Sequence, residues 1–121
     1  MAEYLPLYRP GQAITLKASG AITGGQLVAV SGSGTVAVAG AAAANWVGVA
    51  SNDAATNDYV TIFDDGVQNL TASGTIAAGD SLVTAASGAV ATGAAATPSA
   101  FVGIALTAAT NGNKVRVKLS R

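Results

Sequence analysis

The chain has 121 residues, six of them cationic and six acidic, so its formal net charge is zero, and it contains neither histidine nor cysteine. Without these residue types it cannot build a serine–histidine–aspartate triad, a histidine-bound metal site, a disulfide, an iron–sulfur cluster or a thiolate nucleophile. The few, balanced charges give no basic surface for nucleic acid, so no nucleic-acid partner is expected. Alanine supplies 28 of the hydrophobic residues, which predicts one folded domain with a thin core of small side chains.

Residues 1–12 are predicted to form an extended N-terminal arm. Two prolines fix the backbone angle and remove hydrogen-bond donors, which favours extended chain. The segment has no continuous apolar stretch, so it is not predicted to be a signal peptide. Tyrosine and arginine are enriched in binding hot spots, so we interpret the arm as an interface anchor, with a disordered terminus as the alternative. Its candidate interface residues are Tyr4, Leu5, Pro6, Leu7, Tyr8, Arg9 and Pro10.

Residues 13–121 are predicted to form a single β domain. Short segments alternate apolar and polar residues and are rich in β-branched side chains, which is typical of half-buried strands. The clearest are residues 14–17, 36–38, 47–49, 60–62, 102–104 and 115–119. Clusters of glycine, asparagine, aspartate and serine separate them at roughly 8–12 residues, a spacing that predicts a sandwich or barrel. We expect an all-β fold, a small barrel or sandwich of about ten short strands.

The stretch 27–50 is apolar on average, but serine and glycine interrupt it, so neither a membrane span nor a membrane partner is expected. Within it, residues 40–45 contain four consecutive alanines, and alanine is the best helix former. Six residues are too few to form a stable helix unaided. A loop or a single turn is therefore predicted there.

The chain repeats itself at a nearly constant offset, which indicates an internal duplication. The matching pairs are 16–22 with 70–76, 34–37 with 88–91, 46–50 with 101–105, and 60–62 with 115–117. Residues 25–28 match 79–83 if one insertion is allowed. We infer two pseudo-repeats, 13–66 and 67–121, each with about five strands. Neither half is rich in large side chains, so we expect them to pack as one core with pseudo-two-fold symmetry.

No group of residues predicts catalysis, a metal site or a cofactor. Asp64 and Asp65 lead into a turn glycine, where both carboxylates are expected to face water rather than a cleft. The pairs 52–53 and 57–58 lack the regular acid spacing and the final glutamate of a calcium loop. The glycine-rich stretches have no following lysine with serine or threonine, so they are read as turns and not as phosphate loops. The chain is therefore not predicted to be an enzyme.

Four of the six cations lie in the last eight residues. If 114–119 form a strand, Lys114, Arg116 and Lys118 share its outward face. Two interpretations remain open at this point. Charged side chains protect an edge strand from stray pairing, and they also form contacts with an acidic surface on a neighbouring copy or on a partner. The same three residues are candidate interface residues, together with the arm.

Four segments, taken in order, resemble the capsid decoration proteins of tailed bacteriophages, also called cement proteins. Residues 8–18 place Tyr-Arg-Pro-Gly before a strand that contains Thr-Leu-Lys-Ala, and 21–28 place a double-glycine turn before Leu-Val. The segments 46–50 and 67–70 also fit the family, and the similarity covers nearly the whole chain, from about Tyr8 to Leu119. The alanine-rich stretch 39–44 departs from it. The resemblance implies an all-β protein on the outside of the head, with no catalytic residues or cofactors and with a terminal arm that takes part in binding.

The resemblance also implies the partners. They are the major capsid protein, whose neighbouring subunits such proteins clamp, and further copies of the chain, which form homotrimers at three-fold or quasi-three-fold positions. The expected location is the outer capsid surface of the virion, after synthesis in the host cytoplasm. The alternative is a carbohydrate-binding or adhesin-like β module displayed on a particle or cell surface. Such a module stacks sugars on exposed aromatic rings, whereas Trp46 and its repeat mate Phe101 suggest a shared role in the core.

Overall fold

The computed structural model describes residue 7, residues 12–93 and residues 100–119. Within these residues the regular secondary structure is almost entirely β, which confirms the predicted fold class. The strands are β1 (Ile14–Ala18), β2 (Leu27–Gly32), β3 (Thr35–Val38), β4 (Trp46–Ala50), β5 (Tyr59–Phe63), β6 (Val67–Thr71), β7 (Ser81–Thr84), β8 (Val90–Thr92), β9 (Phe101–Ala105) and β10 (Lys114–Leu119). A 3₁₀ turn, η1 (Ala86–Gly88), joins β7 to β8. No helix in this part of the chain is long and apolar enough to cross a membrane.

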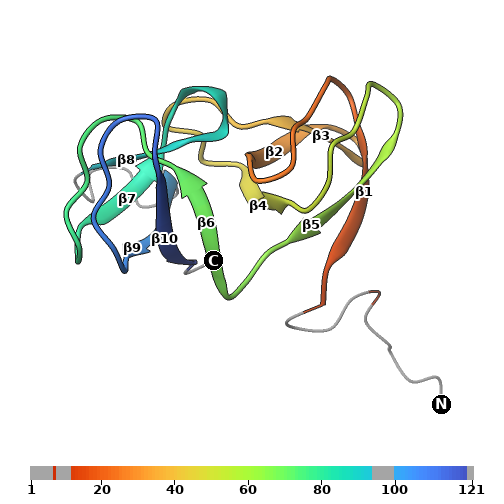
Figure 1. The fold of residues 1–121 in the computed structure, drawn as a ribbon. Helices are drawn as coiled ribbons and strands as arrows, with labels where there is room; N and C mark the ends of the chain where they lie inside the picture. Colours follow the sequence, from red (N-terminus) through yellow and green to blue (C-terminus); the bar gives the residue numbers. More distant parts are fainter. Residues whose placement is uncertain (1–6, 8–11, 94–99, 120–121) are drawn as a thin grey trace, which may run out of the picture.

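The first half is a closed five-stranded barrel, on the right in Figure 1. Its strand order is β1-β3-β2-β4-β5. The barrel closes because β1 pairs on both sides. It is antiparallel to β5 over four residue pairs, and it is parallel to β3 through Lys17 with Thr35 and Ala18 with Val36. The predicted loop or turn at 40–45 is confirmed, since these residues form turns between β3 and β4.

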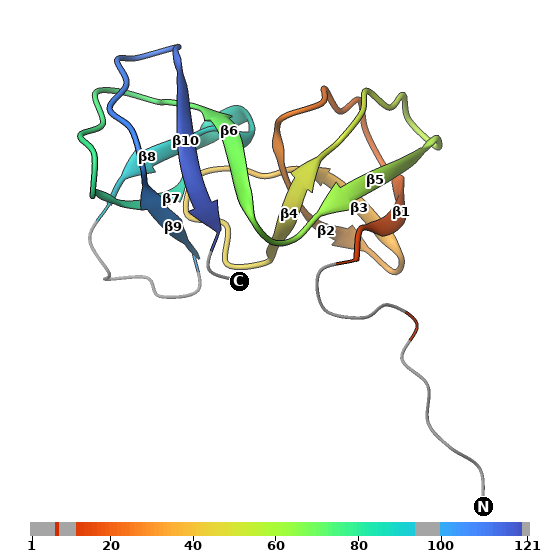
Figure 2. The same ribbon diagram turned by 60° about the horizontal axis from the view of Figure 1, so that its bottom comes forward.

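The second half has the same order of strands, but its sheet does not close into a full barrel, because its two end strands, β6 and β8, are barely paired. Its order is β6-β10-β9-β7-β8. Strands β6 and β8 meet only at one parallel bridge, Ala72 with Val90, which corresponds to Ala18 with Val36 in the first half. The loops that follow β1, β4, β6 and β9 all lie on one side of the molecule, at the top of Figure 2.

The two halves contain equivalent backbone hydrogen bonds. Ile22 and Ala54 exchange two backbone bonds of 2.8 and 2.9 Å, and Ile76 and Ala109 exchange two of the same lengths. The insertion allowed in the sequence alignment is wrong. Val28 pairs with the central glycine of β4, and Leu82 pairs with that of β9, so these two buried residues are equivalent without any insertion.

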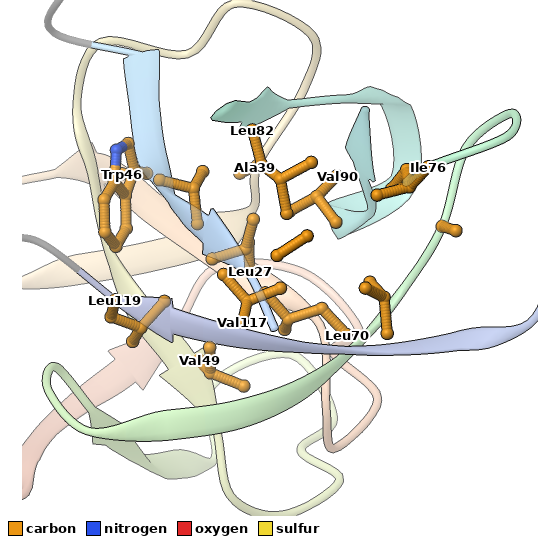
Figure 3. Packing of buried hydrophobic residues seen from close by; sticks show 14 of the residues in the cluster. Leu27, Ala39, Trp46, Val49, Leu70, Ile76, Leu82, Val90, Val117 and Leu119 are labelled. Carbon is orange, nitrogen blue, oxygen red and sulfur yellow. The ribbon is translucent and has the colours of Figure 1, made fainter. Parts of the chain in front are cut away.

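The buried side chains form two clusters, not the single core expected from the sequence. One lies inside the first barrel and contains Ala18, Ile22, Val28, Val36, Ala50, Ala54, Val60 and Ile62. The other fills the second half and also takes in Leu27, Ala29, Ala39, Trp46 and Val49 of the first half. Figure 3 shows Leu27, Trp46 and Val49 beside Val117 and Leu119. The outer face of β2 and β4 therefore covers the core of the more open second half.

This packing explains a departure from simple alternation in β2. Leu27, Val28 and Ala29 are all buried, although successive strand residues point to opposite faces. Val28 points into the first barrel, whereas Leu27 and Ala29 belong to the cluster of the second half. Both faces of β2 are thus covered, and a strand covered on both faces has a continuous apolar run.

Thr84 fixes the junction between the two halves. Its side chain is buried, and its hydroxyl oxygen accepts a 2.7 Å hydrogen bond from the backbone N–H of Ala43. The carbonyl of Thr84 accepts a second bond, of 3.2 Å, from Ala42. The N–H of Gly88 in η1 donates to the carbonyl of Ala39 at 2.9 Å. The loop after β3 is therefore held against the β7–β8 connection.

Replacing Thr84→Val keeps the side-chain shape and removes the oxygen. We expect the free energy of unfolding to fall by about 1–2 kcal/mol, because the Ala43 N–H loses its partner in a part-buried position. The exposed residue Thr75 provides the control, and Thr75→Val is expected to change stability by less than about 0.5 kcal/mol. Urea unfolding followed by tryptophan fluorescence measures both, and equal stability of the two variants would contradict the role of Thr84.

Candidate interface surfaces

Three of the acidic side chains, those of Asp53, Asp65 and Asp80, accept hydrogen bonds in turns. A carboxylate oxygen of Asp53 accepts a 2.8 Å bond from the N–H of Gly24, and Asp65 accepts one of 2.7 Å from the N–H of Gly66. Asp80 accepts bonds from the Ala77 N–H and the Thr92 hydroxyl. Among the described residues, no group of three or more acids is arranged to hold a metal ion. These carboxylates stabilise loops.

A shallow groove of about 400 Å³ lies between the loops that follow β6 and β9. Its lining includes Thr75, Ile76, Asn113 and Lys114 and contains no carboxylate. A lysine without an acid partner does not make an acid–base pair, so the groove has no general acid–base chemistry to offer.

The aromatic residues do not form a sugar-stacking surface around tryptophan. Trp46 is only 1% exposed and belongs to the buried cluster, as the sequence suggested. The large exposed aromatic side chains described are Tyr59 and Phe63, at the two ends of β5. The residue on which the carbohydrate-binding alternative would depend is therefore buried and cannot stack on a sugar.

The structure places Lys114, Arg116 and Lys118 along one exposed side of β10, while the residues between them point into the core. The Nζ of Lys114 donates a 2.9 Å hydrogen bond to the hydroxyl of Thr71 on β6. Edge protection is the wrong explanation for these charges. Strand β10 is paired with β6 on one side and with β9 on the other, so it has no free edge to protect.

Of the seven candidate interface residues in the arm, the structure describes only Leu7, whose side chain is 92% exposed. The other six lie outside the described residues. The arm leads into β1 of the first half, whereas the cationic strand belongs to the second half. The two parts of the predicted interface thus come from different repeats.

Sequence reasoning missed the apolar residues that flank the cations. Val67 on β6 and Ile104 on β9 both pair with Lys118, and the N–H of Leu106 donates to the Arg116 carbonyl. All three apolar side chains are exposed, Val67 by 53%, Leu106 by 48% and Ile104 by 38%. The alternation of 102–104 had placed Ile104 on the buried side. The register shift between β7 and β9 reverses this, which leaves Val102 inside and Ile104 outside.

These features define a charge-poor, all-β protein made of two similar halves. The chain belongs to the phage cement protein family, whose model matches residues 8–120. This family is structural and not enzymatic, in agreement with the sequence prediction. A solved structure of the same fold is the N base of the head fiber gp8.5 in bacteriophage phi29. It is 21% identical, with a TM-score of 0.71, and the match covers 90% of this chain and 93% of that one. Among curated proteins, no relative matches the chain.

Proposed function

We propose that this protein binds the outer surface of a phage head and clamps neighbouring major capsid protein subunits, which stabilises the shell. The observation that carries the proposal is the match to the phage cement protein family across residues 8–120, nearly the whole chain. A structural role at the phage head follows from the family. Attachment to the outer face, contact with the major capsid protein and assembly as a homotrimer at three-fold or quasi-three-fold positions are the finer parts of the proposal.

The surface chemistry supports a permanent structural contact. Only 10% of the residues are charged and the net charge is zero, so little long-range repulsion opposes association. A cement protein has to hold the shell together and needs no reactive group. Many modest contacts, repeated over symmetric copies, give tight attachment through avidity. The similarity in fold to a head-fiber base is consistent with a protein seated on a head.

The test is a binding measurement on purified phage heads and on unassembled major capsid protein. We expect the chain to co-sediment with assembled heads and to bind unassembled subunits weakly, because a clamp needs two neighbouring subunits in place. Heads that carry the protein should also resist heat or dilution better than bare heads. Failure to bind mature heads, or equal binding to free subunits, would contradict the proposal.

Removing residues 1–10 tests the arm. We expect the truncated chain to bind heads at least about tenfold more weakly, because the arm contains two tyrosines and an arginine, residue types that dominate binding hot spots. The melting temperature should not change, because the deletion ends before the first strand. Binding curves on purified heads provide the measurement, and equal occupancy with and without the arm would contradict its role.

A further inference from the structure

We propose that a second copy of this chain docks head-to-tail on the outward face of the second sheet. This surface, called the β10 face below, consists of Val67, Ile104, Leu106, Arg116 and Lys118. Its partner surface is on the first half of the neighbouring copy. The inference rests on the proposed self-association and specifies the surfaces through which it occurs.

The two halves carry opposite charges, although the whole chain is neutral. The segment 13–66 contains one lysine and four aspartates, a net charge of −3. The segment 67–121 contains four cations and one aspartate, a net charge of +3. Each copy is therefore a charge dipole. Head-to-tail association brings the positive half of one copy to the negative half of the next, whereas contact between like halves is repelled.

The fold does not require cations on β10. Its repeat equivalent in the first half is β5, since 60–62 match 115–117. Each of the two strands is paired with a neighbouring strand on both sides. The positions of Arg116 and Lys118 are occupied there by Thr61 and Phe63, and the first barrel closes with these uncharged side chains. In the part of the chain that the structure describes, the Arg116 and Lys118 side chains make no hydrogen bond or ion pair. Their charge is thus available to a partner.

In the first half, the equivalent sheet face is already an interface, because it packs against the second half of the same chain. In the first half, Leu27 and Val49 point outward from the barrel and are buried because the second half covers them. Their equivalents in the second half are Ser81 and Ile104, which are exposed and opposite each other across β7 and β9. The second half therefore presents an uncovered copy of a face that is covered in the first half, and Ile104 continues into the β10 face.

The first half offers matching chemistry along β5. Tyr59 and Phe63 are exposed on this strand, and Asp58 and Asp64 directly precede and follow it. Carboxylates pair with Arg116 and Lys118, and aromatic rings attract guanidinium and ammonium groups through cation–π contact. The complementary surface is thus present on the chain itself, which favours a second copy over an acidic capsid surface as the occupant. A contact between two different surfaces is heterologous, so it forms a ring when its rotation closes.

Sedimentation of the full chain, measured without phage heads, tests the contact independently of capsid binding. We expect the wild-type chain to self-associate, with an association constant that falls as salt is raised. Lys118→Glu should weaken association at least about tenfold, since it sets like charges against Asp58 and Asp64. Lys17→Glu makes the same change in charge on β1, where Lys17 pairs with Tyr59 of the partner surface, and it serves as the matched comparison. It adds a carboxylate to the surface that meets Arg116 and Lys118, so it is expected not to weaken association.

A charge exchange completes the test. Asp58→Lys with Asp64→Lys should also prevent association, and the chain that combines these changes with Arg116→Glu and Lys118→Glu should associate again. Circular dichroism checks that each variant folds. The proposal is overturned if the wild-type chain stays monomeric, if Lys118→Glu and Lys17→Glu behave alike, or if the exchanged chain fails to associate. It is also overturned if Lys118→Glu loses binding to heads but keeps its self-association, because the occupant would then be the capsid.

Discussion

Gly103→Ala is expected to lower the free energy of unfolding by about 3 kcal/mol, at the upper end of the usual cost of overpacking a core. The reason is a close approach between backbones. Gly103 is buried on β9 and pairs with Leu119 of β10, and a methyl group built on it would overlap the carbonyl oxygen of Lys118. A carbonyl in a paired strand cannot rotate away as a flexible side chain can. The melting temperature should fall by roughly 10 °C.

The same environment recurs at Gly48 in the first half, where an added methyl group would meet the carbonyl oxygen of Phe63 and, at 2.7 Å, the side chain of Ile62. Gly48→Ala should therefore be similarly destabilising. Gly20 provides the matched control, because no atom lies within 4 Å of the position that its methyl group would occupy. Thermal unfolding followed by circular dichroism measures all three variants. A Gly103→Ala protein as stable as Gly20→Ala would contradict the close approach.

The glycine repeated at Gly48 and Gly103 shows how far the sequence could predict the fold. The repeated aromatic-Val-Gly pattern at Trp46 and Phe101 identified the duplication, and the alternation of 115–119 predicted the buried and exposed sides of β10 correctly. Both signals are local. The reason for the repeated glycine is a contact between strands, and such contacts are set by register, which a single sequence does not specify.

The parts that sequence reasoning missed all depend on long-range pairing. The central position of β10, the exposure of Ile104 and the burial of Leu27 each follow from which strand lies beside which. The two halves have nearly the same sequence pattern, yet only the first is a closed barrel. Residues of β2 and β4 complete the buried cluster of the more open second half. No property of either half by itself indicates this asymmetry. The same holds for the candidate interface. The cations of β10 could be predicted from local alternation, whereas their apolar neighbours on β6 and β9 depend on long-range pairing and could not.

The dependence of the second half on the first leads to the other large expected effect. The segment 67–121, expressed alone, should not fold. Its cluster includes five buried residues from the first half, namely Leu27, Ala29, Ala39, Trp46 and Val49. Without them, one side of the cluster would be exposed to water along the seam where β6 and β8 share a single bridge. A chain as short as this segment is already marginal in the surface that it buries, so this loss should prevent folding.

The measurement is the amide dispersion of the isolated segment in a nitrogen–proton correlation spectrum. We expect a collapsed, poorly dispersed spectrum for 67–121 alone and a dispersed one after addition of an equal amount of 1–66. Adding 1–66 serves as the control. The mixture then contains every residue of the chain and lacks only the covalent link in the exposed turn between β5 and β6. Recovery on mixing attributes the defect to the missing β2–β4 face. A well-dispersed spectrum for 67–121 alone would contradict the prediction, because it would show that the second half folds as an independent domain.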